Sequence, residues 1–313
     1  AGSLFMLAAF AYLYSKAGSF LITDLIKIPL SATEQFWIFL GFFLAYAIKI
    51  PIIPFHTWQA KVYQMAPTVG TMLLSGIMLK MGLYSIIRWQ LPIAPQAAKQ
   101  LMPIVIGLSI AGVIYGSIVA LRQKDLKKLF AYSSLAHVGL IAAGCYTLTL
   151  DGLAGAVYQM IAHGFVIVGL FYAAEIIYQR YETRKIAEMG GIRVQTPRFT
   201  SMFMILVLAS VALPGTFNFV GEFTVLYALF QTNVWFAVFG GLTIILGAYY
   251  MLKMFQNVML GESNVKAFAD SNLIEIVVFV IIIAFLIWYG LYPKPIVDLV
   301  TPSIKEILTT INR

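Results

Sequence analysis

Five ionisable residues lie well inside long apolar runs of this sequence, and they are Lys49, Lys80, His137, His163 and Glu222. A charged side chain near the middle of a membrane helix costs roughly 2.5–3.5 kcal/mol on insertion scales, so such residues usually face a partner or a water-filled cavity. Lysine, histidine and glutamate side chains can each take up and release a proton. A row of them within hydrogen-bond reach is what a proton relay needs. These residue types therefore predict proton transfer across a membrane.

Polar side chains accompany three of these residues at a spacing of one helical turn: Ser133 before His137, Gln159 before His163 and Asn218 before Glu222. Residues four apart share a helix face, so each pair is expected to point the same way. Structural interpretations stay open for each residue taken alone. A single histidine can be a satisfied core residue, a lysine can extend to the membrane surface, and a glutamate can serve a helix N-terminus only.

The helix break that follows Lys49 explains why a lysine is tolerated at this position in an apolar run. Pro51 and Pro54 interrupt the apolar run and should end the helix there. Lys49 then lies at the C-terminal end of a half-helix, where the negative end of the helix dipole favours a cation. A broken helix at membrane depth is tolerated only where it is buried in protein or lines water.

A second break is predicted at Pro214 and Gly215, shortly before Glu222. The positive dipole end of the following half-helix favours an anion. Two broken helices with charges of suitable sign match the discontinuous helices that hold ions in transporters with inverted repeats. The tetrapeptide MLKM occurs at 78–81 and again at 251–254, each time in the span after a broken helix, and this repetition hints at two related halves.

The composition is that of a polytopic membrane protein. Of the 313 residues, 61% are hydrophobic and only 11% are charged, whereas soluble domains carry about 25% charged residues. The net charge of +8 reflects basic loops between apolar spans, which fits membrane orientation rather than nucleic-acid binding. Cys145 is the single cysteine, so no disulfide forms within the chain.

The predicted fold is an all-α transmembrane bundle with two discontinuous helices, and residues 1–313 form one membrane domain. A span needs about 20 apolar residues, and a β-barrel would instead show short alternating segments. The loop at 179–198 is too short for a soluble domain. The expected spans are residues 3–22, 35–54, 68–89, 101–121, 129–149, 153–178, 199–230 (interrupted at 213–215), 234–256 and 273–292.

The charges of the loops predict the orientation. With these spans, 12 basic residues including Lys266 lie on one side, and 7 including Arg313 lie on the other. The richer side is expected to be cytoplasmic. The sequence begins inside an apolar run without an initiator methionine, so we expect it to be the C-terminal piece of a longer chain.

Motifs for cofactors are missing from the sequence. It contains no GxGxxG, no P-loop and no cysteine cluster, and its three histidines lack metal-ligand spacing. We therefore expect no nucleotide, flavin, iron–sulfur or metal site in this chain. His56 is expected to be structural, and Glu175 is expected to form a local ion pair with Arg180.

Six segments in order carry a resemblance to a known family: KIPIIPFHTW, APTVGTMLLSGIMLKMGLY, KKLFAYSSLAHVG, QMIAHG, ETRKIAEMGGI and LPGTFNFVGEF. Together they resemble the antiporter-like membrane subunits of respiratory complex I, over almost the whole chain. The glutamate of LPGTFNFVGEF is typical of the subunit-4 branch, because sister branches usually carry a lysine there. The resemblance implies a fold of about fourteen helices with two inverted five-helix repeats, of which this chain covers the last nine.

The resemblance also implies roles for individual residues. Lys49 corresponds to the lysine of the first broken helix, Lys80 to a connecting lysine, His137 and His163 to midplane histidines, Glu222 to the exit-side acid and Arg184 to a loop arginine. Two departures stand out. The family's glutamate on the helix preceding this chain's first span is missing here, so the first half-channel is expected to be incomplete. Gln59-Ala60-Lys61 replaces the Pro-Asp that usually follows Trp58, which puts the usual contacts of this loop in doubt.

The expected function is that of a proton-translocating membrane subunit of a NADH–quinone oxidoreductase in the bacterial inner membrane. Redox chemistry is expected in other subunits, so this chain should need no cofactor. Its expected partners are other membrane subunits, including neighbouring antiporter-like subunits, together with protons and lipid, and no nucleic acid. A cation/proton antiporter subunit, a membrane-bound hydrogenase subunit and a non-conducting scaffold remain the alternatives.

Overall fold

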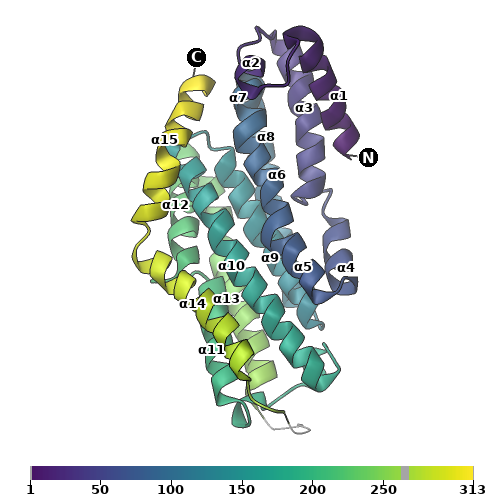
Figure 1. Cartoon of the computed structure of the whole chain (residues 1–313), viewed down its shortest axis with the longest axis vertical. Coiled ribbons are helices and arrows are strands. Elements are labelled where there is room, and N and C mark those ends of the chain that lie inside the picture. The colour runs from purple at the N-terminus through teal and green to yellow at the C-terminus, as the bar shows by residue number, and fades with distance from the viewer. Residues whose placement is uncertain (1, 262–267, 313) are drawn as a thin grey trace.

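The computed structural model describes residues 2–261 and 268–312, which form a bundle of helices along one long axis (Figure 1). This part of the chain contains no β-strand and only one isolated bridge, between Asp125 and Lys185. Lys266 and Arg313, which entered the charge comparison, lie outside the described residues. The predicted all-α fold class is confirmed.

Each of the nine predicted spans coincides with a helix or with a helix pair. The third span is one continuous helix of α5, α6 and α7 with two π-helical segments, η1 and η2, and the seventh is the pair α11 and α12. The elements in order are α1 (Gly2–Ala17), α2 (Ile22–Leu25), α3 (Ala32–Lys49), α4 (Thr57–Met65), α5 (Thr68–Leu73), η1 (Leu74–Met78), α6 (Leu79–Ser85), η2 (Ile86–Gln90), α7 (Leu91–Ile93), α8 (Pro95–Leu121), α9 (Leu126–Cys145), α10 (Leu150–Tyr181), η3 (Ile186–Glu188), η4 (Ile192–Val194), α11 (Pro197–Ser210), α12 (Phe217–Thr232), α13 (Val234–Met259), α14 (Leu273–Leu291) and α15 (Lys294–Ile311).

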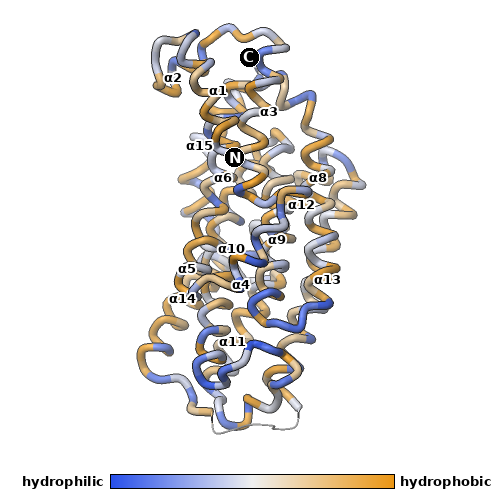
Figure 2. Tube along the Cα trace, turned by 90° about the vertical axis from the view of Figure 1, so that its right-hand side faces the viewer, coloured by the Kyte–Doolittle hydropathy of each residue, from blue (hydrophilic) through white to orange (hydrophobic). Residues whose placement is uncertain are grey.

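Six helices of the described residues are long and apolar enough to cross a membrane: the α5–α7 unit, α8, α9, α10, α13 and α14. Of these, α9 is the most enclosed by other helices and α14 the least. The hydropathy tube shows hydrophobic residues along the shaft of the bundle and hydrophilic residues gathered near the start of α9 and around α11 (Figure 2). The chain is therefore a multi-pass integral membrane protein.

The first predicted break lies where the prolines place it. Helix α3 ends at Lys49, and the chain resumes as α4 at Thr57. The Ile52 amide donates to the Ala47 carbonyl at 2.8 Å, and the Trp58 indole donates to the Ile48 carbonyl at 2.8 Å. These bonds satisfy carbonyls that the end of a helix leaves without an intrahelical partner.

The second predicted break is also present, between Ser210 at the end of α11 and Phe217 at the start of α12. Gly215 has a φ of +90°, a conformation that suits glycine. Helix α14 packs its own glycine against this turn: a Cβ at Gly290 would lie 2.3 Å from the Gly215 carbonyl oxygen and 2.5 Å from the carbonyl carbon of Thr216. The break is thus held by a close approach of backbones.

Close contacts at glycine residues also position the helices at the centre of the bundle. A Cβ at Gly164 of α10 would lie 3.1 Å from the Gly76 carbonyl of η1, and a Cβ at Gly221 of α12 would lie 2.9 Å from the Cα of Gln159. Small residues let membrane helices pack at short range. Helix α10 therefore lies tightly against both the lysine-bearing helix and the glutamate-bearing helix.

Two features of the bundle were not predicted correctly. Arg180 pairs with Glu275 of α14, at 2.7 Å between Nη2 and Oε2, so the predicted ion pair of Arg180 with Glu175 is wrong. Glu175 instead accepts hydrogen bonds from Thr68 and Gln179. Helix α15 was not foreseen either, and it packs through Ile304, Ile307 and Ile311 along α10 and near α7.

Candidate functional site

Lys80 lies in α6, directly after the π-helical segment η1, and is 9% exposed. Its ammonium donates to the Ser75 carbonyl, and Nζ lies 2.8 Å from Nδ1 of His163 on α10. A lysine held in this way does not extend to the membrane surface, so that interpretation is wrong for Lys80. Segments of π-helix occur frequently at functional sites, and here one precedes the lysine.

His163, His137 and Glu222 continue the line away from Lys80. The two imidazole rings have centroids 5.6 Å apart. Nδ1 of His137 on α9 lies 2.8 Å from Oε1 of Glu222 on α12, although the ring is not oriented for an aligned hydrogen bond. All three side chains are at most 4% exposed. The fold therefore brings four predicted residues from four helices into one buried line.

Glu222 is held by side chains rather than by a helix end. The Gln159 amide donates to its Oε1 at 3.0 Å. Glu222 lies in the second turn of α12, whose N-cap is Thr216, so its interpretation as an N-cap is wrong. The helix dipole acts mainly within the first turn, so His137 and Gln159 supply the local stabilisation.

Several buried polar atoms along this line have no hydrogen-bond partner among the described residues. They are Nε2 of His163, Oε2 of Glu222, Oε1 of Gln159 and both amide atoms of Asn218. Buried polar groups in folded proteins are nearly always hydrogen-bonded to protein or to ordered water. These atoms can therefore accept or donate further hydrogen bonds to ordered water beside the line.

Lys49 takes a different position from the other four residues. It is the last residue of α3, as predicted, but its side chain is exposed. It borders a cavity of about 290 Å³ with Gly2 and Trp58. A Cβ at Gly82 of α6 would lie 3.8 Å from the Lys49 Cβ, so the backbone of the break reaches the lysine-bearing helix. No hydrogen bond within the described part of the chain joins Lys49 to Lys80.

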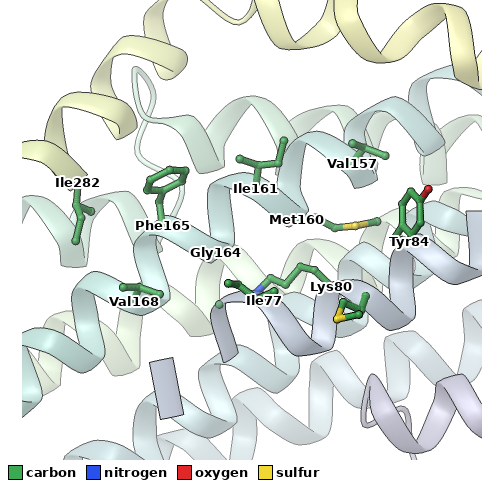
Figure 3. Close-up of a pocket in the computed structure, with 12 residues that line it drawn as sticks. Ile77, Lys80, Tyr84, Val157, Met160, Ile161, Gly164, Phe165, Val168 and Ile282 are labelled. Atoms are coloured by element: carbon green, nitrogen blue, oxygen red, sulfur yellow. The ribbon is translucent and has the colours of Figure 1, made fainter. Parts of the chain in front are cut away.

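A second cavity, of about 590 Å³, borders Lys80. Figure 3 shows the lysine between α6 and α10, with Ile77, Met160 and Phe165 among the surrounding apolar side chains. An ammonium that faces such a surface is stabilised by the Ser75 carbonyl and by His163 rather than by the cavity.

Two hydrogen bonds beside the line involve residues that were not predicted. Ser75 and Ser134 lie 3.3 Å apart through their hydroxyl oxygens, and the Tyr250 hydroxyl donates to Oγ of Ser133 at 3.0 Å. For Tyr250 one signal was available, because it directly precedes the second MLKM at 251–254. Ser75 and Ser134 give no such signal, since serine is common in membrane helices.

The remaining predicted residues lie toward the end of the bundle where α9 begins. Arg184 donates from Nη1 to the Gln64 carbonyl at 3.4 Å and lies over the Tyr178 ring at 4.0 Å. It thus connects the loop after α10 with the end of α4. The Gln59-Ala60-Lys61 segment, expected in a loop, lies within α4 instead, where Gln59 is buried and Lys61 is exposed.

His56 precedes α4 and packs its ring edge against Tyr115, with centroids 4.7 Å apart. Among the described residues it has no hydrogen bond to the buried line, and its structural role stays a prediction. Across the described ranges, 2–261 and 268–312, no group of three or more His, Cys, Asp or Glu side chains has the arrangement of a metal site.

The sequence also matches a family of known proteins. The family model described as NADH:quinone oxidoreductase/Mrp antiporter, transmembrane, matches residues 1–248. The chain belongs to this family. The NADH-quinone oxidoreductase subunit M of Rickettsia prowazekii is 41% identical over 314 residues, which cover 98% of this chain and 64% of that protein. The chain thus spans somewhat less than two thirds of the length of this relative.

Solved structures show the antiporter fold for the whole described bundle. A chain of respiratory complex I from Thermus thermophilus with bound NADH superposes with a TM-score of 0.94 at 32% identity, covering 99% of this chain and 67% of that one. A chain of the Mrp complex from a Dietzia species superposes with a TM-score of 0.87 at 18% identity, covering 99% of this chain and 67% of that chain. The latter likeness is one of fold alone.

Proposed function

We propose that this chain conducts protons across the bacterial inner membrane as part of a NADH–quinone oxidoreductase. Within that complex it would belong to the subunit type that the name of the Rickettsia relative describes. Its partners would be other membrane subunits, including antiporter-like neighbours, and the redox reaction would take place outside this chain. The proposal therefore requires no cofactor here.

The observation that carries the proposal is the buried line Lys80–His163–His137–Glu222. Its members come from four different helices, and each is within direct or single-water reach of the next. Charged groups are costly in hydrocarbon, and a scaffold gains nothing from four of them in a row. A proton path needs this continuity.

Proton transfer between the two members of a neighbouring pair leaves the net charge of that pair unchanged. A proton that passes from the Lys80 ammonium to His163 leaves the pair with one positive charge before and after the step. A proton shared between Glu222 and His137 leaves that pair neutral in both states. Each step therefore moves charge over a short distance, which matters because the surroundings have a low dielectric constant. The sites titrate as a coupled set.

In this scheme Lys49 acts before Lys80. Its position at the end of α3 and the close packing of Gly82 on the same break place the first broken helix beside the lysine-bearing helix. A change in the charge or position of Lys49 would alter the electrostatic potential at Lys80. Such coupling is the means by which redox-driven changes elsewhere in the complex would move a proton.

Replacing Glu222 with Gln tests the proposal. Gln keeps the shape of the side chain and one acceptor for the Gln159 amide, but it cannot carry a proton. We expect NADH-driven proton uptake per quinone reduced, or the coupled turnover rate, to fall about threefold or more. Native membrane vesicles carrying the variant chain serve for the measurement, after a native gel shows that the complex is assembled.

Glu182→Gln is the matched control, since Glu182 is an exposed loop residue that makes no side-chain hydrogen bond to the described residues. It should leave both quantities unchanged. Unchanged stoichiometry and rate in assembled Glu222→Gln complex would instead make the buried charges structural, and the scaffold interpretation would replace the proposal.

A further inference from the structure

A polar cavity of about 520 Å³ lies at the end of the bundle where α8 and α13 finish and α9 begins. Its rim carries Arg122, Lys124 and Lys253, all exposed, together with Asn257. We call it the basic vestibule. None of its described lining residues is acidic. Unlike the apolar cavity beside Lys80, this cavity has the volume and the polar side chains that ordered water needs.

Tyr250 connects the basic vestibule with the buried line. Its side chain lines the cavity, yet the residue is only 2% exposed. Its hydroxyl donates to Oγ of Ser133 at 3.0 Å. Ser133 lies on α9 one turn before His137, which contacts Glu222. Among the described lining residues, Tyr250 is the one with a hydrogen bond to a residue on the histidine-bearing face of α9.

The MLKM repetition relates this tyrosine to the other half of the bundle. Around the first copy, Ile77, Lys80 and Met81 line the apolar cavity. The corresponding positions around the second copy are Tyr250, Lys253 and Met254, and they line the basic vestibule. In the first half the lysine reaches the buried line. In the second half the lysine is exposed, and the tyrosine three positions earlier makes the inward contact instead.

Gly247 lies beside the Tyr250 hydroxyl on the same helix. A Cβ at Gly247 would lie 3.6 Å from the hydroxyl oxygen and 3.9 Å from the adjacent ring carbon, with no closer neighbour outside its own helix backbone. A methyl group would therefore fit there at ordinary contact distance. The absence of a side chain at Gly247 therefore leaves room for one methyl group beside the hydroxyl.

We propose that the hydroxyl of Tyr250 passes protons between water in the basic vestibule and the line formed by Ser133, His137 and Glu222. The hydroxyl accepts a proton from a vestibule water as its own proton moves to the Ser133 oxygen, and the proton of Ser133 passes to the imidazole of His137. The phenol and the serine are neutral before and after the transfer, and the water is left as hydroxide until it is reprotonated from bulk. The inference rests on the proposed function and adds to it a second access route.

The variant Tyr250→Phe removes this hydroxyl and keeps the ring that lines the cavity. We expect NADH-driven proton uptake in native vesicles to fall about two- to tenfold, since one hydrogen-bonded step is lost. The solvent deuterium isotope effect on proton uptake should also change, which a purely structural role would not produce. Tyr227→Phe is the control, because Tyr227 is 48% exposed and its hydroxyl has no partner among the described residues.

Gly247→Ala provides an independent second variant. It leaves the Tyr250–Ser133 bond in place and fills the space beside the hydroxyl, and alanine is the better helix former, so the helix itself is not weakened. A fall in proton uptake in both variants supports the inference. Normal uptake in Tyr250→Phe overturns it, as does a fall there with an unchanged isotope effect and normal uptake in Gly247→Ala.

The result for Glu222→Gln separates the two proposals. If Glu222→Gln lowers proton uptake while Tyr250→Phe and Gly247→Ala do not, the access route is wrong and the proposed function stands. If none of the three variants lowers it, the proposed function itself fails. Each comparison uses the assembled complex, verified on a native gel.

Discussion

Replacing Lys80 with Met is expected to lower coupled NADH oxidation and proton uptake to about a tenth of the wild-type values or less. A positioned proton-transfer group commonly contributes about 10²–10⁴-fold to a rate. Methionine is unbranched and similar in length, so it fills the same space between α6 and α10. It cannot carry a proton to His163, from which Nζ of the lysine lies 2.8 Å away. The line loses its first buried member.

Folding should survive this change because the neighbouring cavity is apolar. Met160 and Phe165 line it already, and the buried ammonium carries a desolvation cost that methionine does not. Proton uptake and coupled oxidation are measured in native vesicles after the assembled complex is verified. Lys99→Met is the control, since Lys99 is exposed near the start of α8. Wild-type proton uptake in assembled Lys80→Met complex would remove Lys80 from the conducting path.

Substituting Ala for Gly290 should prevent most of the complex from assembling. The new Cβ would lie 2.3 Å from the Gly215 carbonyl oxygen and 2.6 Å from the Thr216 Cα, closer than real contacts allow. These are backbone atoms of the α11–α12 break, so no side chain can turn away. Overpacking of a well-packed site typically costs about 1–3 kcal/mol, and a backbone collision belongs at or above the upper end.

Gly107→Ala is the matched control for this prediction. A Cβ at Gly107 of α8 would have no neighbour within 4 Å outside the helix backbone, so the same substitution should leave assembly intact. The measurement is the amount of assembled complex on a native gel and its thermal stability in detergent. Normal assembly of Gly290→Ala would show that α14 does not hold the second break, and the packing described for the break would be wrong.

Much of the fold was predictable because the bilayer restricts the choices. Backbone groups in hydrocarbon must be satisfied within a helix, so an apolar run of sufficient length predicts a helix and its approximate ends. The prolines at 51, 54 and 214 predict both breaks, because proline lacks an amide donor and clashes with the preceding turn. Helix α15 escaped prediction because its apolar residues form one stripe, whereas the predicted spans are apolar on all sides.

The candidate site was predictable residue by residue but not as an arrangement. Lys80, His137, His163 and Glu222 were found because ionisable groups are rare in apolar spans. Their pairing was not foreseen: Gln159 was assigned to the face of His163, yet its amide binds Glu222. Lys49 was expected with the others and is instead exposed beside Gly2 and Trp58. Tyr250 gave only the weak signal of the repeated MLKM.

Hydropathy and the placement of prolines and charges are therefore enough to establish an all-α membrane bundle, its two broken helices and the ionisable residues of the buried line. Those properties depend on each segment separately, through the cost of exposing charge or backbone to hydrocarbon. The order of the line, the contact of Tyr250 with Ser133 and the closure of the second break by Gly290 depend on which helix faces meet. The sequence of one apolar helix does not show which other helices it packs against. Close packing at residues such as Gly164 and Gly221 determines which helices are neighbours.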